Sequence, residues 1–295
     1  MNERERGFLL LTSHLGNPDR RPLTTAQLRT LACRVREAEF SGEDRELTLS
    51  DLLCLGYGRE SAGHMLSLLE DQALLDRYLE RGRSAGCVPI TRVGEDYPLT
   101  LRQRLGQDSP GCLWARGDLS AIKHPAVSLV GSRELEPRNR EFAREVGYQA
   151  GVHGFTLISG NARGADREAQ NSCLEAGGRV ISVVADELAR KFCPKNMLML
   201  SEEDFDEPFS TPRALSRNRV IHALGQITFV AQSHLGTGGT WDGTTRNLRF
   251  GWSAVACFRD GSQAMEELEQ QGAWLIGREE IEDFLLKPEE PLSLF

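Results

Sequence analysis

The sequence of 295 residues has no apolar run that approaches the roughly 20 residues of a membrane-spanning helix. Its first residues, MNERERGFLLLTS, lack the small-residue cleavage site of a secretory signal peptide. The seven cysteines are scattered, and none is spaced as CxxC. We therefore expect a cytoplasmic protein with free thiols, no membrane partner, no disulfide framework and no metal site.

The chain also lacks the short motifs of familiar catalytic and cofactor sites. Neither GxSxG nor HExxH occurs, and the six histidines have no ligand spacing. The glycines of Val127–Asp166 follow neither the GxGxxG dinucleotide pattern nor the GxxxxGK[ST] phosphate loop. From these absences we expect no cofactor and no catalytic residue.

What is present is an alternation of short apolar strands and helices from residue 126 onward. Strands are predicted at 127–130, 155–158, 179–184, 227–231, 254–258 and 274–276, with helices between them. This rhythm predicts an α/β fold, a Rossmann-like doubly wound and mostly parallel sheet with right-handed crossovers. We expect four segments: a helical domain at 1–85, a connector with short strands at 86–125, the Rossmann-like domain at 126–277 and an acidic tail at 278–295.

The first 85 residues have a helical pattern. Thr24 or Thr25 can cap a helix over Ala26–Val35, and a single long helix is predicted over Ser61–Arg83. Between them, a short helix, the turn Gly56-Tyr57-Gly58 and a second helix resemble a helix-hairpin-helix or SAM-like module. Such a hairpin can set backbone N–H groups against DNA phosphates, and an inert helical bundle fits the same pattern.

Four loops are predicted to meet at one edge of the sheet, because the carboxyl ends of parallel strands lie together. They are Gly131–Arg133, Ser159–Asp166, Arg217–Arg219 and the glycine-rich Gly236–Gly243. Small residues, helix N-termini and arginines at such an edge are suited to binding phosphate.

Net charge alone, −8, argues against a nucleic-acid partner. However, Ser210–Phe250 holds five arginines (Arg213, Arg217, Arg219, Arg246 and Arg249) against the single acid Asp242. A local patch of this kind can bind phosphates whatever the total charge. The alternative is that these arginines pair with carboxylates elsewhere in the fold. Asp166 is likewise open to two readings, a structural residue that caps the following helix or holds an arginine, or a general acid–base group.

At these residues the chain resembles the DNA-processing protein A family, DprA or Smf. The matching motifs are Val-Gly-Ser-Arg ending at Arg133, Ser159-Gly160 followed by Ala162-Arg163-Gly164 and Asp166, and Arg217-Asn218-Arg219. The resemblance implies a homodimer without catalytic turnover, which binds and protects single-stranded DNA and loads a RecA-type recombinase onto it. The candidate DNA- or phosphate-binding residues are Gly131, Ser132, Arg133, Ser159, Gly160, Arg163, Gly164, Asp166, Asn196, Arg217, Asn218, Arg219, Gly236, Thr237, Gly238, Gly239 and Thr240.

The chain departs from the family pattern at several positions, which indicates a divergent branch. Gln170 stands where the family usually has histidine, and Ala214-Leu-Ser precedes Arg217 where an aromatic residue is usual. Phe209 or Trp241 could supply that aromatic contact. The chain also ends too soon for the winged-helix domain that some members carry.

Two further readings stay open. Gly236–Thr240 is similar to the glycine loop of nucleotide phosphoribohydrolases and nucleotide-sensing Rossmann domains, so a nucleotide N-glycosidase is the alternative function. Pro291–Phe295 resembles the peptide that bacterial replication proteins insert into the sliding clamp, with Leu292, Leu294 and Phe295 as the contacting residues. A tail that folds back onto its own domain is the alternative for that segment.

Overall fold

The structure is a computed structural model that describes residues 1–38 and 46–286. The chain divides into two compact units, one of residues 1–85 and 89–97 and one of residues 86–88 together with the chain from residue 98 onward. The strand β1 (Val88–Thr91) lies where the chain passes between them. In the described residues no helix is long and apolar enough to cross a membrane.

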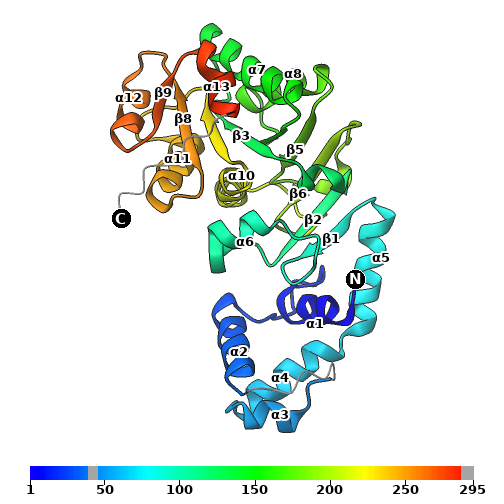
Figure 1. The fold of residues 1–295 in the computed structure, drawn as a ribbon. Coiled ribbons are helices and arrows are strands. Elements are labelled where there is room, and N and C mark those ends of the chain that lie inside the picture. The colour runs from blue at the N-terminus through cyan, green and yellow to red at the C-terminus, as the bar shows by residue number, and fades with distance from the viewer. Residues whose placement is uncertain (39–45, 287–295) are drawn as a thin grey trace. The chain divides into compact units, whose positions relative to one another are not determined.

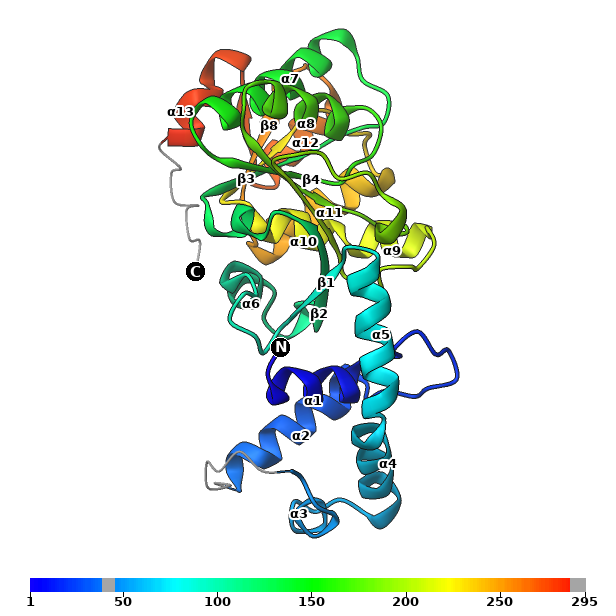
Figure 2. The same ribbon diagram turned by 90° about the vertical axis from the view of Figure 1, so that its right-hand side faces the viewer.

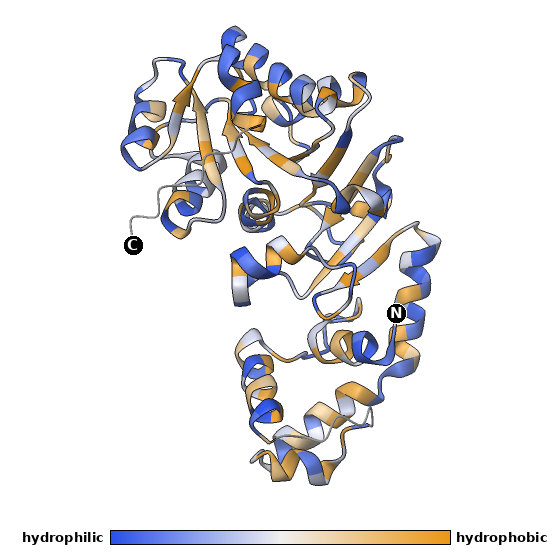
Figure 3. Cartoon of the chain, viewed as in Figure 1, coloured by the Kyte–Doolittle hydropathy of each residue, from blue (hydrophilic) through white to orange (hydrophobic). Residues whose placement is uncertain are grey.

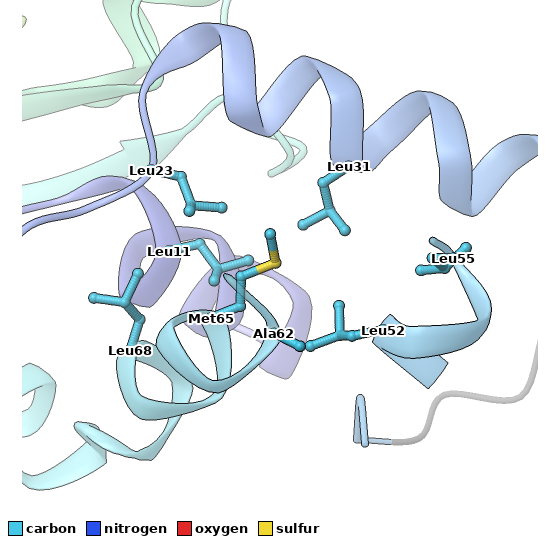
Figure 4. Packing of buried hydrophobic residues seen from close by; sticks show 8 residues of the cluster. All are labelled: Leu11, Leu23, Leu31, Leu52, Leu55, Ala62, Met65 and Leu68. Carbon is cyan, nitrogen blue, oxygen red and sulfur yellow. The ribbon is translucent and has the colours of Figure 1, made fainter. Parts of the chain in front are cut away.

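The first unit is built from helices around a small leucine-rich core. Figure 4 shows this core, in which Met65 lies among leucine side chains from several helices. The prediction of a short helix, a turn and a second helix is confirmed by α3 and α4, which flank Gly56 in its left-handed conformation (φ 80°). The helices are α1 (Glu3–Thr12), α2 (Thr25–Glu37), α3 (Leu49–Cys54), α4 (Arg59–Glu70) and α5 (Gln72–Ser84).

The prediction of one long helix over 61–83 is wrong, because the helix breaks at Asp71. The buried Arg20 explains the break: its Nη2 donates to the carbonyl of Leu68 at 2.9 Å, and its Nε donates to Asp71 Oδ2 at 2.9 Å. A side chain that donates to the last carbonyl groups of a helix replaces the backbone N–H groups of a further turn, so the helix can end there. Thr24, one of the two predicted caps, does begin α2 and accepts from the N–H of Gln27.

The second unit contains a mostly parallel sheet, which confirms the predicted fold class (Figure 1). Its strands follow the order β2-β6-β5-β4-β3-β7-β8-β9. All neighbouring pairs are parallel except β2 with β6, which is antiparallel. The strands are β2 (Cys112–Gly117), β3 (Ala126–Val130), β4 (Thr156–Ser159), β5 (Arg179–Val183), β6 (Met197–Ser201), β7 (Ile227–Val230), β8 (Ala254–Phe258) and β9 (Trp274–Ile276).

Strand β6 was not among the predicted strands. Its sequence, Met-Leu-Met-Leu-Ser, consists largely of residues that favour helices, and all five residues are buried. Neither alternation nor β-branched side chains therefore marks it in the sequence. Its pairing between β5 and β2 makes it a central strand, which explains the complete burial.

Helices cover both faces of this sheet, with α7 and α8 on one face and α10 and α11 on the other (Figures 1 and 2). Figure 3 shows that the strands between these layers are mainly hydrophobic. Helices α7 and α8 pack backbone to backbone, since a β-carbon at Gly147 would lie 2.1 Å from the carbonyl oxygen of Ala169. The helices are α6 (Leu99–Leu105), α7 (Pro137–Val152), α8 (Ala165–Glu175), α9 (Thr211–Ser216), α10 (Asn218–Leu224), α11 (Gly238–Phe250), α12 (Gln263–Gln270) and α13 (Ile281–Leu286).

The strand order reverses between β3 and β7. From β3 the chain builds outward through β4 and β5, whereas β7, on the other side of β3, continues through β8 and β9. Loops that leave two adjacent parallel strands toward opposite faces open a crevice at the carboxyl ends of the strands. The fold therefore places the preferred ligand position at the ends of β3 and β7.

Candidate functional site

A cavity of about 440 Å³ lies at the carboxyl ends of β3 and β7. Each of the four loops that were predicted to meet contributes to its lining. The lining residues are Val130, Gly131, Ser132, Arg133, Ala162, Asp166, Phe209, Thr211, Ala214, Leu215, Arg217, Asn218, Gln232, Ser233, His234, Thr237, Gly238, Gly239 and Thr240.

The N-terminus of α11 forms one wall of the cavity. Thr237 precedes the helix in an extended conformation, and its side chain does not cap the N–H groups of the first turn. These uncapped N–H groups and the helix dipole attract an anion. Asn218 fixes this turn by donating from Nδ2 to the carbonyl of Gly239 at 3.0 Å. The predicted glycine loop is therefore shorter than Gly236–Gly243, because the helix already begins at Gly238.

The loop after β3 forms the opposite wall, and small residues hold it against α8. A β-carbon at Gly131 would lie 2.5 Å from Ala165 Cβ, and one at Gly164 would lie 2.4 Å from the carbonyl oxygen of Ser132. Gly164 also has a positive φ of 78°. The N–H of Ala165 donates to that same carbonyl at 3.1 Å. These contacts explain why both glycines are needed, the second for its backbone conformation as well.

Arg217 and Asp166 place opposite charges in the floor of the cavity. Burial lowers the pKa of the Arg217 guanidinium, and the neighbouring Asp166 opposes that shift. Burial likewise raises the pKa of the Asp166 carboxyl, against the effect of Arg217. Asp166 Oδ2 accepts from the N–H of Ala162 at 3.0 Å, which ties the loop after β4 to the start of α8. Asp166 does not cap α8, because the helix has Gly164 as its N-cap and no side-chain cap. Its interaction with Arg217 agrees with the other structural reading, in which Asp166 holds an arginine.

Two buried polar atoms of the cavity residues have no hydrogen-bond partner among the residues that the structure describes. They are Nε of Arg217 and Oγ of Ser233. Burying such groups unpaired costs roughly 1–3 kcal/mol each, and more for a charged group. A ligand that accepts from the guanidinium would remove part of this cost.

An apolar wall completes the cavity. Phe209, Ala214 and Leu215 line it, and Phe209 is 55% exposed. Of the two aromatic residues proposed to compensate for Ala214-Leu-Ser, Phe209 lines the cavity and Trp241 is not among the lining residues. An exposed aromatic ring beside anion-binding groups is an arrangement that can stack a base.

Several predicted site residues lie outside the cavity lining. Ser159 is fully buried and accepts from Gln170 Nε2 at 2.6 Å, so Gln170, at the position where histidine is usual, has a structural contact. Gly160 lies beneath Arg217. Arg163 is exposed. Gly236 adopts a left-handed backbone conformation and directly precedes the cavity-lining residue Thr237. Asn196 lines a second cavity with Arg116 and Phe192, away from the four loops.

Arg219 also lies outside the cavity, although it is only two residues from Arg217. Its Nη2 forms an ion pair with Glu202 Oε2 at 2.7 Å, and its Nη1 donates to the carbonyl of Ser216 at 2.7 Å. The side chains of Arg219 and Glu202 are 17% and 5% exposed. Arg219 is therefore a structural residue.

The predicted basic patch over 210–250 is wrong as a single surface. Arg217 lines the cavity, whereas Arg219 pairs with Glu202 and Arg246 lies 3.9 Å from Asp242. Arg213 donates to the carbonyls of Glu207 and Pro208 and so holds the turn before α9. The alternative reading, an ion pair with a carboxylate elsewhere in the fold, describes Arg219.

The loop after β7 was missed by the sequence reasoning. Gln232, Ser233 and His234 line the cavity, the carbonyl of Gln232 accepts from the N–H of Ser132 at 3.0 Å, and His234 Nε2 lies 3.4 Å from Ser132 Oγ. The signal was available, since the strand predicted at 227–231 ends there.

Neither a metal site nor the clamp-like peptide adds to the described site. In the described residues no group of three or more histidine, cysteine or acidic side chains could hold a metal ion. Leu292, Leu294 and Phe295 lie outside the described residues.

Comparison with known proteins gives the same picture as the sequence motifs. The family model for DNA recombination-mediator protein A matches residues 89–286. The DNA processing protein DprA of Streptococcus pneumoniae (strain ATCC BAA-255 / R6) is 26% identical over 257 residues, which cover 82% of this chain and 88% of that protein. The protein Smf of Synechocystis is 29% identical over 171 residues, covering 53% of this chain and 42% of that protein.

Two solved structures share the fold. The crystal structure of DprA from Streptococcus pneumoniae superposes with a TM-score of 0.74 at 23% identity and covers 97% of this chain and 99% of its own. A DNA processing protein A structure from Helicobacter pylori, described for its single-stranded DNA binding mode, gives a TM-score of 0.58 at 20% identity. It covers 69% of this chain and 97% of its own.

Proposed function

This chain belongs to the DNA recombination-mediator protein A family, and from that premise we propose that its cavity binds single-stranded DNA. The observation that carries the proposal is the combination of three features in one cavity. The N–H groups at the start of α11 and the guanidinium of Arg217 donate hydrogen bonds to a phosphate, and the exposed ring of Phe209 stacks a base. Together they match one nucleotide of a strand.

The cavity favours a single strand over a duplex. Its volume, about 440 Å³, is that of a small-ligand pocket, and the aromatic ring lines its wall. A base can reach such a ring only when it is unstacked and unpaired. Within a duplex that base would have to be flipped out, at a cost of a few kcal/mol.

The proposed role is to mediate DNA recombination by binding, without catalysing a reaction. We infer, from the resemblance of its motifs, that the protein protects single-stranded DNA, loads a RecA-type recombinase and acts as a homodimer. The cavity supports binding chemistry because the Arg217 guanidinium and the start of α11 are suited to phosphate. Asp166 already accepts from the backbone N–H of Ala162, which leaves it a positioning role.

The test is fluorescence anisotropy with single-stranded and duplex oligonucleotides over a salt series. We expect single strands to bind more tightly than duplexes, with an affinity that falls steeply as salt rises. Arg133→Gln removes an exposed arginine of the lining and should weaken binding. It should also lower the slope of log affinity against log salt by the amount of about one phosphate contact. The matched control, Arg249→Gln at the last turn of α11, should bind as the wild type does. Absence of single-strand binding at low salt contradicts the proposal.

The recombinase step needs its own assay. Addition of the protein should accelerate assembly of RecA filaments on single strands coated with single-strand-binding protein, and Arg133→Gln should reduce that acceleration. Wild-type binding without any acceleration would leave a DNA binder that is not a loader. Sedimentation across a concentration series tests the homodimer.

A second candidate function is a nucleotide phosphoribohydrolase. The glycine-rich start of α11 and a cavity that suits one nucleotide favour it. Incubation with nucleoside monophosphates separates the two functions, because only the enzyme releases free base. The clamp-binding segment stays a separate prediction. Deletion of residues 291–295 should abolish binding to the sliding clamp and leave DNA binding unchanged.

A further inference from the structure

The charges around the mouth of the cavity are distributed unevenly. On the side of α9, the segment 202–207 between β6 and Phe209 carries five carboxylates. It is anchored to the helices there, since Glu202 pairs with Arg219 and the carbonyl of Glu207 accepts from Arg213 Nη1 at 2.9 Å. The five are Glu202, Glu203, Asp204, Asp206 and Glu207.

On the side of α8, three exposed arginines outnumber the two exposed acids of the loop after β3, Glu134 and Glu136. Arg133, Arg163 and Arg167 are exposed, and their side chains form no ion pair or hydrogen bond with any residue that the structure describes. Glu168, the acid beside Arg167, is already shared by Arg140 and Arg144 at 3.6 and 3.5 Å. Three unpaired guanidinium groups are therefore available on this side.

These three arginines are close together along the backbone. A β-carbon at Gly164 would lie 2.5 Å from the carbonyl oxygen of Arg133, so the residues before and after Gly164 adjoin the loop that carries Arg133. Arg167 lies in the first turn of α8, four residues after Arg163. We call Arg133, Arg163 and Arg167 the α8 arginine cluster. Figure 2 shows α8 and α9 on opposite sides of the strands, so the cluster and the acidic segment lie on different sides of the cavity.

We infer that single-stranded DNA leaves the cavity across the α8 arginine cluster and away from the acidic segment 202–207. This inference rests on the proposed function, since it assigns the path of the strand beyond the nucleotide that the cavity holds. Guanidinium forks match phosphate oxygens in pairs, whereas carboxylates repel a polyanion. Arg133 belongs to both the cavity and the cluster, and it therefore joins the two along the strand.

The path predicts that the cluster matters for long strands and not for short ones. A dinucleotide such as dT2 can fill the cavity, whereas dT20 also reaches Arg163 and Arg167. The variant Arg163→Gln/Arg167→Gln should weaken dT20 binding by roughly tenfold and lower its salt slope by about 1.4, the value for two phosphate contacts on a single strand. Its affinity for dT2, measured by competition, should stay within about twofold of the wild type.

The matched control is Arg246→Gln/Arg249→Gln, which removes the same charge from the later turns of α11, about 12 Å and more along the helix from its N-terminus. This variant should keep the wild-type ratio of dT20 to dT2 affinity. The inference is overturned if the cluster variant keeps that ratio, or if it and the control lose affinity equally. If the wild type binds neither oligonucleotide, the proposed function itself fails, which is a separate and recognisable result.

Discussion

The guanidinium of Arg217 occupies the space above Gly160, so that a β-carbon on Gly160 would lie only 1.8 Å from Nη1. The glycine after β4 is thus the residue that lets an arginine from the opposite helix layer enter the floor of the cavity. Two segments almost sixty residues apart depend on each other here. The relationship explains why Gly160 matters even though it does not line the cavity.

This dependence gives the first prediction. Gly160→Ala should push the Arg217 side chain from its position and weaken single-strand binding by roughly tenfold, about the effect of losing one charge-assisted phosphate contact. Stability should change by less than about 1 kcal/mol, because the end of a flexible side chain can move aside. Anisotropy and chemical denaturation measure the two effects. Gly63→Ala, in α4 with nothing within 4 Å, is the control and should leave binding unchanged. Full binding by Gly160→Ala would show that the position of Arg217 is unimportant.

The second prediction concerns base stacking by Phe209. Phe209→Leu should weaken binding of dT20 by about 1–3 kcal/mol, because it removes an aromatic face and keeps an apolar side chain. Phe209→Tyr should retain binding. Phe192→Leu is the control, since Phe192 is 83% exposed beside the second cavity. Equal affinities for the leucine and tyrosine variants would exclude stacking at this position.

The sequence predicted most of the sheet and the meeting of the four loops, because strand spacing and glycine positions carry that information directly. It could not separate Arg217 from Arg219. Two residues along a helix differ by about 200° in direction, so the start of α10 at Asn218 decides which arginine reaches the cavity. Strand β6 was missed for a related reason, since its methionines and leucines are buried by neighbouring strands that local patterns do not reveal.

The third prediction follows from the structural role of Arg219. Arg219→Gln should lower the free energy of unfolding by about 3 kcal/mol, because Glu202 would be left as a nearly buried and unpaired carboxylate. Adding Glu202→Gln should restore part of that loss. At a temperature where both variants are folded, single-strand binding should match that of the wild type. A strong binding defect in the folded double variant would mean that Arg219 does contact the ligand.

The fourth prediction concerns the pH dependence of stability that His222 causes. Burial lowers the pKa of His222 to about 3. Asn247 uses its amide hydrogens on Ser253 Oγ at 3.0 Å and on His222 Nδ1 at 3.1 Å, so Nδ1 accepts and cannot take a proton without losing this contact. Between pH 6.5 and about 3 the unfolded chain binds a proton at His222 that the folded chain does not. Stability should therefore fall as the pH is lowered through that range, by about 2 kcal/mol at pH 5 relative to neutral pH.

A variant is needed to isolate this effect, because the raised pKa of the buried Asp166 acts in the opposite direction: that carboxyl stabilises the fold as the pH falls. His222→Asn keeps an acceptor for Asn247 and removes the titrating group, so the difference in unfolding free energy between wild type and variant should shrink by about 2 kcal/mol from pH 7 to pH 5. Urea denaturation at several pH values measures it. A constant difference would mean that His222 takes up its proton equally in both states, and the packing of α10 against α11 around this ring would then be looser than the structure shows.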